Sequence, residues 1–217
     1  MFIGHYGVAF GAKALSPKVS LGVLVFAAQW LDLLWPTLLL TGAEKVEIKP
    51  GIMTASPFDF TGYPYSHSLA MVLLWSLLFG IIYFLVKKDK SGALVVGICV
   101  LSHWILDLFM HRADLPLYPG DSPKFGWGLW NSFAGTQIAE LVFIFTGVLL
   151  YTKATKPKNK TGIYSFWTFV VLLVALHFLN YFGPTPTSVS AIAWGAQLQW
   201  LFVLWAFWID GNRVEKF

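Results

Sequence analysis

The chain has 217 residues, of which 57% are hydrophobic and 12% are charged. Soluble globular domains carry about 25% charged residues, so this composition excludes an ordinary soluble enzyme of this length, a disordered chain and a coiled coil. The single cysteine, Cys99, excludes a disulfide framework and a cysteine-based zinc ribbon. The net charge is +4, and the positions of the basic residues decide what that charge means.

Several segments of the chain are long and apolar enough to cross a membrane. A bilayer core needs about 20 apolar residues per helix, and six segments meet that requirement. They are roughly Leu21–Leu40, Ser68–Val86, Gly92–Phe109, Thr136–Thr152, Tyr164–Phe182 and Ala191–Ile209. The sequence therefore predicts an all-α fold, a polytopic membrane helical bundle of about six transmembrane helices, in which residues 1–217 form a single integral membrane domain.

The stretch before the first span, Phe2–Leu15, is apolar but too short to cross a bilayer. It does not have the pattern of a cleavable signal peptide, because Lys13 and Lys18 follow the apolar run instead of preceding it. We expect a half-helix buried from the cytoplasmic side, whose length of roughly 18 Å brings His5 to the midplane of the bilayer. Its free N-terminal amides would favour a bound anion there.

The basic residues are divided unequally between the two sides of the predicted bundle. Eleven lysines and arginines lie in residues 1–20, 87–91, 153–163 and the C-terminal tail, which share one side, whereas the opposite side has four. Positive-inside asymmetry therefore predicts that both termini are cytoplasmic. Membrane topology explains the basic charge, so the expected partners are membrane lipids and no nucleic acid is expected.

The two longest outer loops, residues 41–67 and 110–135, are rich in glycine, proline and aromatic residues. Two interpretations fit them equally well: an aromatic lid over the outer face of the protein, or a belt of interfacial aromatic side chains. Either arrangement places the loops above the outer ends of the spans.

Three acidic residues, Asp32, Asp107 and Glu140, lie inside the predicted spans. No lysine or arginine lies in any of these spans to pair with them. A charged side chain at mid-bilayer costs about 2.5–3.5 kcal/mol even on the insertion scale, so three unpaired carboxylates need an explanation. They are either protonated or neutralised by a cation that the sequence does not supply.

Histidines near these acids favour a bound metal ion. His103, Asp107 and His111 follow one another at intervals of four residues, about 40° apart around a helix, so they project from one face. The HxxxD pair is a bidentate clip whose imidazole nitrogen and carboxylate oxygen lie one turn apart. His67 opens the second span on the same side. Ligand-type residues from four spans therefore fall in the outer half of the membrane.

Several of these residues also have a purely structural interpretation. His67 and His111 could be solvated residues at the membrane interface, and Glu140 a protonated acid bonded across helices. Asp59 lies in a loop, where it is either solvated or an alternative ligand to the acid of the first span. His177 is expected to make an interhelical hydrogen bond and is left out of the metal set.

The ordered motifs His5, Asp32, Ser66-His67-Ser68 and Ser102-His103-Trp104-Ile105-Leu106-Asp107 resemble the YdjM-like family of membrane-bound metal-dependent hydrolases. That family is distantly similar to the zinc-dependent phospholipase C and P1 nuclease group, helical proteins whose zinc cluster is bound by histidine, aspartate and glutamate. The resemblance covers about residues 1–145 and implies a bacterial inner-membrane location. It implies the metal ligands His5, Asp32, His67, His103, Asp107, His111 and Glu140.

The resemblance implies a membrane-embedded hydrolase of phospholipase C-like or phosphodiesterase type, with one to three zinc ions and manganese or iron as alternatives. The catalytic carboxylates would be Asp32, as a bridging ligand or base for a metal-activated water, and Glu140. A site beneath the outer loops favours a phosphoester or lipid-like substrate. Two other classes stay open: an ion- or proton-coupled transporter that uses the same groups as a relay, and a non-catalytic membrane scaffold.

Overall fold

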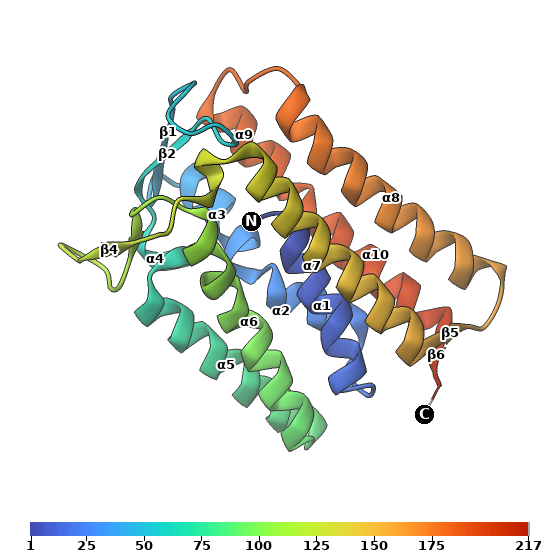
Figure 1. Ribbon diagram of the computed structural model, residues 1–217. Helices are drawn as coiled ribbons and strands as arrows, with labels where there is room; N and C mark the ends of the chain where they lie inside the picture. Colours follow the sequence, from blue (N-terminus) through green and yellow to red (C-terminus); the bar gives the residue numbers. More distant parts are fainter. Residues whose placement is uncertain (217) are drawn as a thin grey trace.

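Helix α1 (Ile3–Leu15) runs through the interior of the bundle in the computed structural model, which describes residues 1–216 (Figure 1). It packs against α2, α6 and α7. Glycines allow the closest of these approaches: a Cβ on Gly7 would lie 2.3 Å from the carbonyl oxygen of Phe143, and a Cβ on Gly147 would lie 2.0 Å from that of Gly7. The expected half-helix is therefore present, and its N-terminal turn is buried inside the protein.

The predicted first span is broken into two helices. Helix α2 (Leu21–Ala28) starts at Ser20, whose hydroxyl accepts a hydrogen bond from Val23 N, and α3 (Trp30–Leu40) follows after Gln29. The two helices are bent by 53° relative to each other. The expectation of one continuous helix over Leu21–Leu40 is thus corrected, and the bend brings α3 toward the outer loops.

Five helical segments among residues 1–216 are long and apolar enough to cross a membrane, and six if the bent pair α2–α3 counts as one span. This finding confirms the predicted membrane bundle of about six spans. Each of the five segments starts at a side chain that accepts a hydrogen bond from the backbone three residues later, as helix caps do. These caps are Ser68, Asp89, Ser132, Asn159 and Ser188. The segments are α5 (Leu69–Lys87), α6 (Lys90–Met110), α7 (Phe133–Ala154), α8 (Lys160–Phe182), and the pair α9 (Val189–Gln197) and α10 (Gln199–Gly211), which forms one span.

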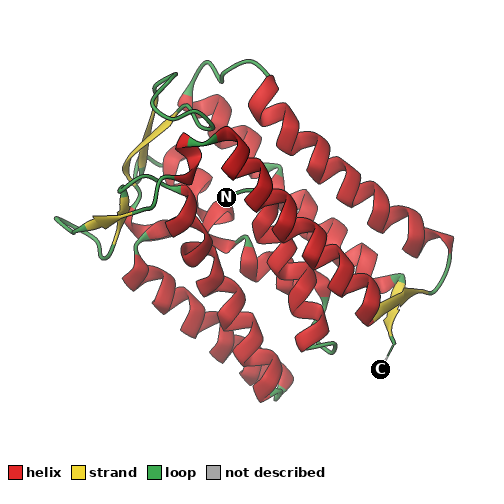
Figure 2. Ribbon diagram, viewed as in Figure 1, coloured by secondary structure: helices red, strands yellow, loops and turns green. Residues whose placement is uncertain are grey.

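Short antiparallel strand pairs lie at the two ends of the bundle (Figure 2). At one end, β1 (Lys45–Ile48) pairs with β2 (Phe58–Gly62), and β3 (Leu115–Pro116) pairs with β4 (Lys124–Phe125). The one-turn helix α4 (Pro64–His67) and the 3₁₀ turn η1 (Leu129–Asn131) complete this end, which we call the loop end. At the other end, β5 (Thr155–Pro157) pairs with β6 (Arg213–Glu215).

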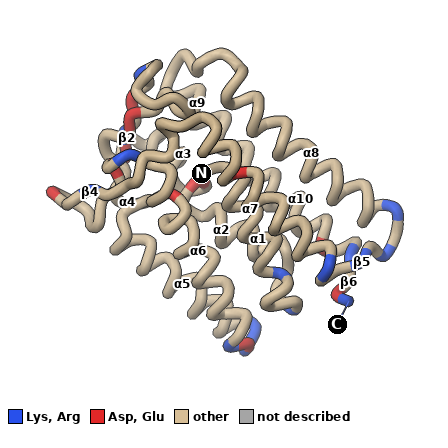
Figure 3. The backbone as a smooth tube through the Cα atoms, viewed as in Figure 1, with Lys and Arg blue, Asp and Glu red and all other residues tan. Residues whose placement is uncertain are grey.

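The two ends also differ in charge. Figure 3 shows lysines and arginines gathered at the turn between α5 and α6 and around β5 and β6, while acidic residues are frequent at the loop end. Between the ends, the outward face of α5 is apolar, with Leu77, Ile81 and Leu85 all exposed. An exposed apolar face is typical of a helix that contacts lipid. This face lies between the two charged ends, as the predicted membrane topology requires.

Candidate metal centre

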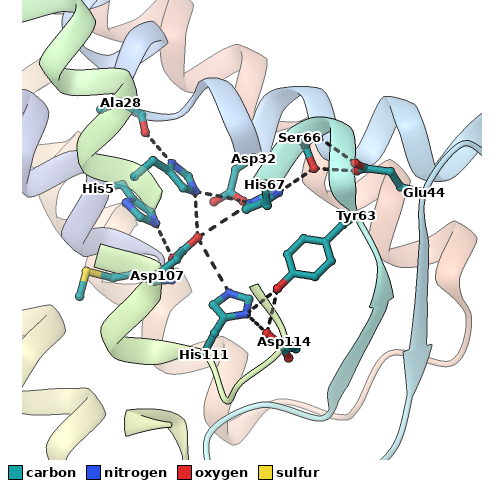
Figure 4. Close-up of polar contacts among 12 residues, drawn as sticks. His5, Ala28, Asp32, Glu44, Tyr63, Ser66, His67, Asp107, His111 and Asp114 are labelled. Atoms are coloured by element: carbon teal, nitrogen blue, oxygen red, sulfur yellow. Dashed lines mark hydrogen bonds and ion pairs between the residues drawn. The ribbon is translucent and has the colours of Figure 1, made fainter. Parts of the chain in front are cut away.

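Histidines and aspartates from four helices meet near the N-terminal end of α1, next to the loop end (Figure 4). All of them are buried except Asp32, whose side chain is 22% exposed. They are His5 on α1, Asp32 on α3, His67 at the end of α4, His103 and Asp107 on α6, and His111 directly after α6. The structure therefore brings together residues separated by up to 106 positions.

The carboxylate of Asp107 lies at the centre of this group. Its Oδ1 is 3.2 Å from His5 Nε2, and its Oδ2 is 3.4 Å from His103 Nε2. The same Oδ2 lies 3.8 Å from His67 Nε2 and 3.9 Å from His111 Nε2. Four imidazoles thus present their Nε2 atoms to one carboxylate.

Asp32 supplies a second carboxylate on the cavity side of the group. Its Oδ1 lies 3.6 Å from His67 Nε2 and 3.6 Å from His103 Nε2. The His103 imidazole is therefore shared between Asp32 and Asp107, and it stacks on His5 with ring centroids 3.6 Å apart.

These separations suit a metal ion. Two ligand atoms that each lie about 2.0–2.1 Å from a tetrahedral zinc ion are about 3.3 Å from each other. In the described chain, the ring nitrogens of His5 and the Nε2 atom of His103 are buried and have no hydrogen-bond partner. Two three-residue groups have ligand atoms close enough to share an ion: His5, His103 and Asp107, and Asp32, His67 and His103. The donor set and its unpartnered nitrogens thus fit a zinc-type centre.

The break between α2 and α3 orients His103. The carbonyl oxygen of Ala28, the last residue of α2, lies 2.7 Å from His103 Nδ1. A carbonyl can only accept a hydrogen bond, so Nδ1 carries a proton and Nε2 is turned toward Asp32 and Asp107. In an unbroken helix this carbonyl would accept from the backbone four residues later.

A chain of hydrogen bonds orients His67 in the same way. Glu44 accepts hydrogen bonds from the Ser66 amide at 2.8 Å and from the Ser66 hydroxyl at 2.6 Å, and its Oε1 also accepts from Tyr65 N. Because the hydroxyl donates to Glu44, its oxygen accepts from His67 Nδ1, 2.6 Å away. The Nε2 lone pair of His67 is left for the site.

Asp114 does the same for His111. Its Oδ1 lies 2.9 Å from His111 Nδ1 and accepts a 2.8 Å hydrogen bond from the buried hydroxyl of Tyr63. Sequence reasoning missed Glu44, Tyr63 and Asp114. The three-residue spacing from His111 to Asp114 was a usable signal, whereas nothing in the sequence linked Glu44 to His67.

A family model described as YdjM inner membrane protein matches residues 8–183. The chain belongs to this family. The match covers most of the chain and every site residue described above except His5, and together with the apolar helices it supports the prediction of an integral membrane protein. No curated protein and no solved structure matched the chain.

In this YdjM-family protein, Glu140 lies beside the start of α1 and not among the imidazoles. Its two carboxylate oxygens accept hydrogen bonds from Phe2 N at 2.7 Å and Gly4 N at 2.8 Å. The anion that the free amides of α1 were expected to attract is therefore the side chain of Glu140 itself. These contacts favour a role in positioning α1 over the predicted ligand and catalytic roles.

Asp59 is held at the loop end by two cations. Its carboxylate accepts a hydrogen bond from Lys49 Nζ at 2.6 Å and forms a close ion pair with Arg112. The hydrogen bond from Lys49 and the charge of Arg112 hold the pKa of Asp59 below its ordinary value. Asp32, and not Asp59, lies among the imidazoles. The expected interhelical bond of His177 is confirmed, because His177 Nε2 lies 2.8 Å from Gln137 Oε1 on α7.

A cavity of about 760 Å³ opens beside the site. Asp32, His67, Asp107 and His111 line one end of it. Aromatic residues of the outer loops cover this end, with Phe60 and Trp130 among its lining and their ring centroids 4.8 and 4.3 Å from that of His111. Other loop aromatics are instead exposed, as expected for an interfacial belt: Tyr118, Phe125 and Trp127. The structure therefore divides the loop aromatics into a group packed beside the site and an exposed group.

Proposed function

We propose that this protein is a membrane-embedded, metal-dependent hydrolase that cleaves a phosphoester in an amphiphilic, lipid-like substrate. One observation carries the proposal. His67, His103 and His111 each have Nδ1 bound to a separate acceptor, and each turns Nε2 toward the carboxylate of Asp107. Outer partners of this kind are typical of histidines that bind metal ions.

The proposed metal-holding residues follow from the two three-residue groups. His5, His103 and Asp107 would hold one ion, and Asp32, His67 and His103 offer a second position. Mixed imidazole and carboxylate ligands suit zinc, with manganese or iron as alternatives. A bound ion of this type acidifies a water molecule and polarises a phosphoryl oxygen.

Asp32 is the side chain best placed to accept the proton of the attacking water. It is the most exposed acid of the site, lines the cavity and faces two imidazoles. A carboxylate in this position can orient an attacking water and accept its proton. Asp107 is only 2% exposed and surrounded by nitrogen atoms, so its proposed task is to hold the site together.

Metal analysis of the purified protein tests the proposal. We expect stoichiometric zinc, manganese or iron by mass spectrometry, and loss of most of it in the variants Asp107→Asn and His103→Ala. His177→Ala is the matched control, because His177 is a buried histidine bonded to Gln137 and not to the site. Thermal melting in detergent identifies any variant that fails to fold.

A wild-type protein that contains no metal, and whose melting temperature is unchanged by chelators, would contradict the proposal. It would favour a transporter that uses these histidines and acids as a proton relay, or a scaffold in which they bond helices together. If metal is present, hydrolysis of bis(p-nitrophenyl) phosphate and of phospholipids in vesicles tests the reaction itself.

A further inference from the structure

The cavity extends well beyond the candidate metal centre, into a second arm between the last spans. This arm is lined by residues of α8, of the segment 183–186, and of α9 and α10, and its polar lining residues are Asn180, Tyr181, Thr185 and Gln199. Among its lining residues are Leu176 and Leu179 of α8, Ile192 and Gly195 of α9, and Phe202 of α10. We propose that this arm binds one hydrocarbon chain of the substrate, which enters sideways from the bilayer between α8 and α9. This inference rests on the proposed function, since the hydrocarbon chain belongs to the lipid-like substrate of the proposed hydrolase.

Charge is the first observation that carries the proposal. The end of the cavity at the metal centre contains Asp32, Asp107 and Glu140, whereas the lining residues from Leu176 to Phe202 include no charged side chain. A cavity that is ionic at one end and uncharged at the other matches an amphiphile whose phosphate binds the proposed metal ions at the charged end, because the carboxylates alone would repel a phosphate. Its volume of about 760 Å³ falls in the range of pockets for organic ligands, about 300–1,000 Å³.

Access from the membrane is the second observation. Two residues of the lining, Leu179 and Leu198, are 66% and 59% exposed, so the arm reaches the outer surface of the protein at these positions. Both lie on helices that are long and apolar enough to cross a membrane. The surface around them faces lipid, so the molecules that meet this opening are lipid chains and not water-soluble ligands.

The connection between α8 and α9 borders the cavity. Figure 1 shows these helices joined at the loop end, near β1 and β2. Pro184 and Pro186 lie in this short connection and line the cavity. Proline fixes its own backbone angle, so the two prolines restrict the conformations of this connection.

Glycine 195 offers a direct test of this arm. A Cβ added to Gly195 meets no atom within 4 Å, and the residue lines the cavity, so position 195 has open space from which a larger side chain can occupy the arm. Gly195→Phe should therefore fill the arm. Gly211→Phe is the matched control, because Gly211 has equally free space in α10 but lies outside the cavity lining.

The probe is phosphatidylglycerol with a photoreactive diazirine at the end of one acyl chain, in vesicles of phosphatidylcholine that contain the purified full-length protein. We expect crosslinks in residues 176–202 that fall at least fivefold in Gly195→Phe and stay unchanged in Gly211→Phe. Crosslinks to the lipid-facing residues Leu77 and Ile81 on α5 measure ordinary lipid contact and should be equal in all three proteins.

Crosslinks in residues 176–202 that are no stronger than those on α5, or that persist in Gly195→Phe, would overturn the chain site. Crosslinking needs no catalysis, so its outcome is independent of the metal analysis. A protein that passes the crosslinking test but contains no metal would keep the chain site and lose the hydrolase assignment. A metal-loaded protein that hydrolyses bis(p-nitrophenyl) phosphate but fails the crosslinking test would keep the hydrolase assignment and lose the chain site.

Discussion

Three imidazoles of the site are oriented by three chemically different acceptors. His103 uses the carbonyl of Ala28, His67 uses the hydroxyl of Ser66, and His111 uses the carboxylate of Asp114. The result is the same each time, because Nδ1 is occupied and Nε2 is left for the centre. These outer contacts fix which nitrogen is available before any ion binds.

Removing the charge of Glu44 should weaken the centre without touching a proposed ligand. Glu44 accepts three hydrogen bonds from Tyr65 and Ser66, and the amide nitrogen of a glutamine would face one of those donors. We expect Glu44→Gln to lower zinc affinity about 10- to 100-fold, measured by competition with a chelator. Glu47→Gln is the control, since Glu47 lies on the same loop, is exposed and pairs with Lys49 and not with the site. Equal affinities in the two variants would contradict a role for Glu44 in orienting His67.

The two aspartates that the sequence left as alternatives can be separated by experiment. Asp32→Asn should release at least half of the bound metal, because Asp32 faces His67 and His103. Asp59→Asn should leave the metal content unchanged but make residues 45–62 more sensitive to protease, because it loses the contacts to Lys49 and Arg112. Metal analysis and limited proteolysis of both variants measure these effects, and the opposite pattern would restore Asp59 as a ligand.

At the scale of helices, regular periodicity made part of the site predictable. The HxxxD spacing placed His103 and Asp107 on one face of α6, and the short apolar N-terminal stretch correctly predicted a half-helix that brings His5 inward. The break at Gln29 was not predictable, because apolar residues continue on both sides of it and no glycine or proline marks the position. Glu44 and Asp114 reach their histidines through loops, whose paths no helical periodicity describes.

The contact between α1 and α7 predicts different effects for two glycines that lie one helical turn apart. In Gly7→Ala, the new Cβ would lie 2.3 Å from the backbone oxygen of Phe143, so α1 must move away from α7 and carry His5 with it. In Gly11→Ala, the nearest atom is a methyl group of Leu150 at 3.4 Å, an ordinary contact. We expect Gly7→Ala to lower the melting temperature and the metal content, and Gly11→Ala to change neither. Unaltered metal in Gly7→Ala would show that α1 does not position the centre.

The whole molecule has two chemically distinct ends, and their orientation in the membrane is a prediction from the positive-inside rule. Cysteines introduced at exposed positions can test it, because the native Cys99 is buried. In a Cys99→Ser background, Asp121→Cys at the loop end should react with a membrane-impermeant maleimide in intact cells. Lys90→Cys at the start of α6 should react only after the cells are opened. The reverse result would place the loop end, and with it the cavity, on the cytoplasmic side.

The hydrogen bond between Ala28 and His103 links the shape of the chain to its chemistry. It satisfies a carbonyl that the bend has released from the helix ladder inside an apolar bundle, where an unbonded carbonyl is costly. Position 103 is therefore under two constraints, one from folding and one from the proposed metal site. A descendant that abandoned the reaction would still need a hydrogen-bond donor there. No such folding constraint acts at position 5, whose imidazole has no hydrogen-bond partner among the described residues, so other residues could replace histidine there.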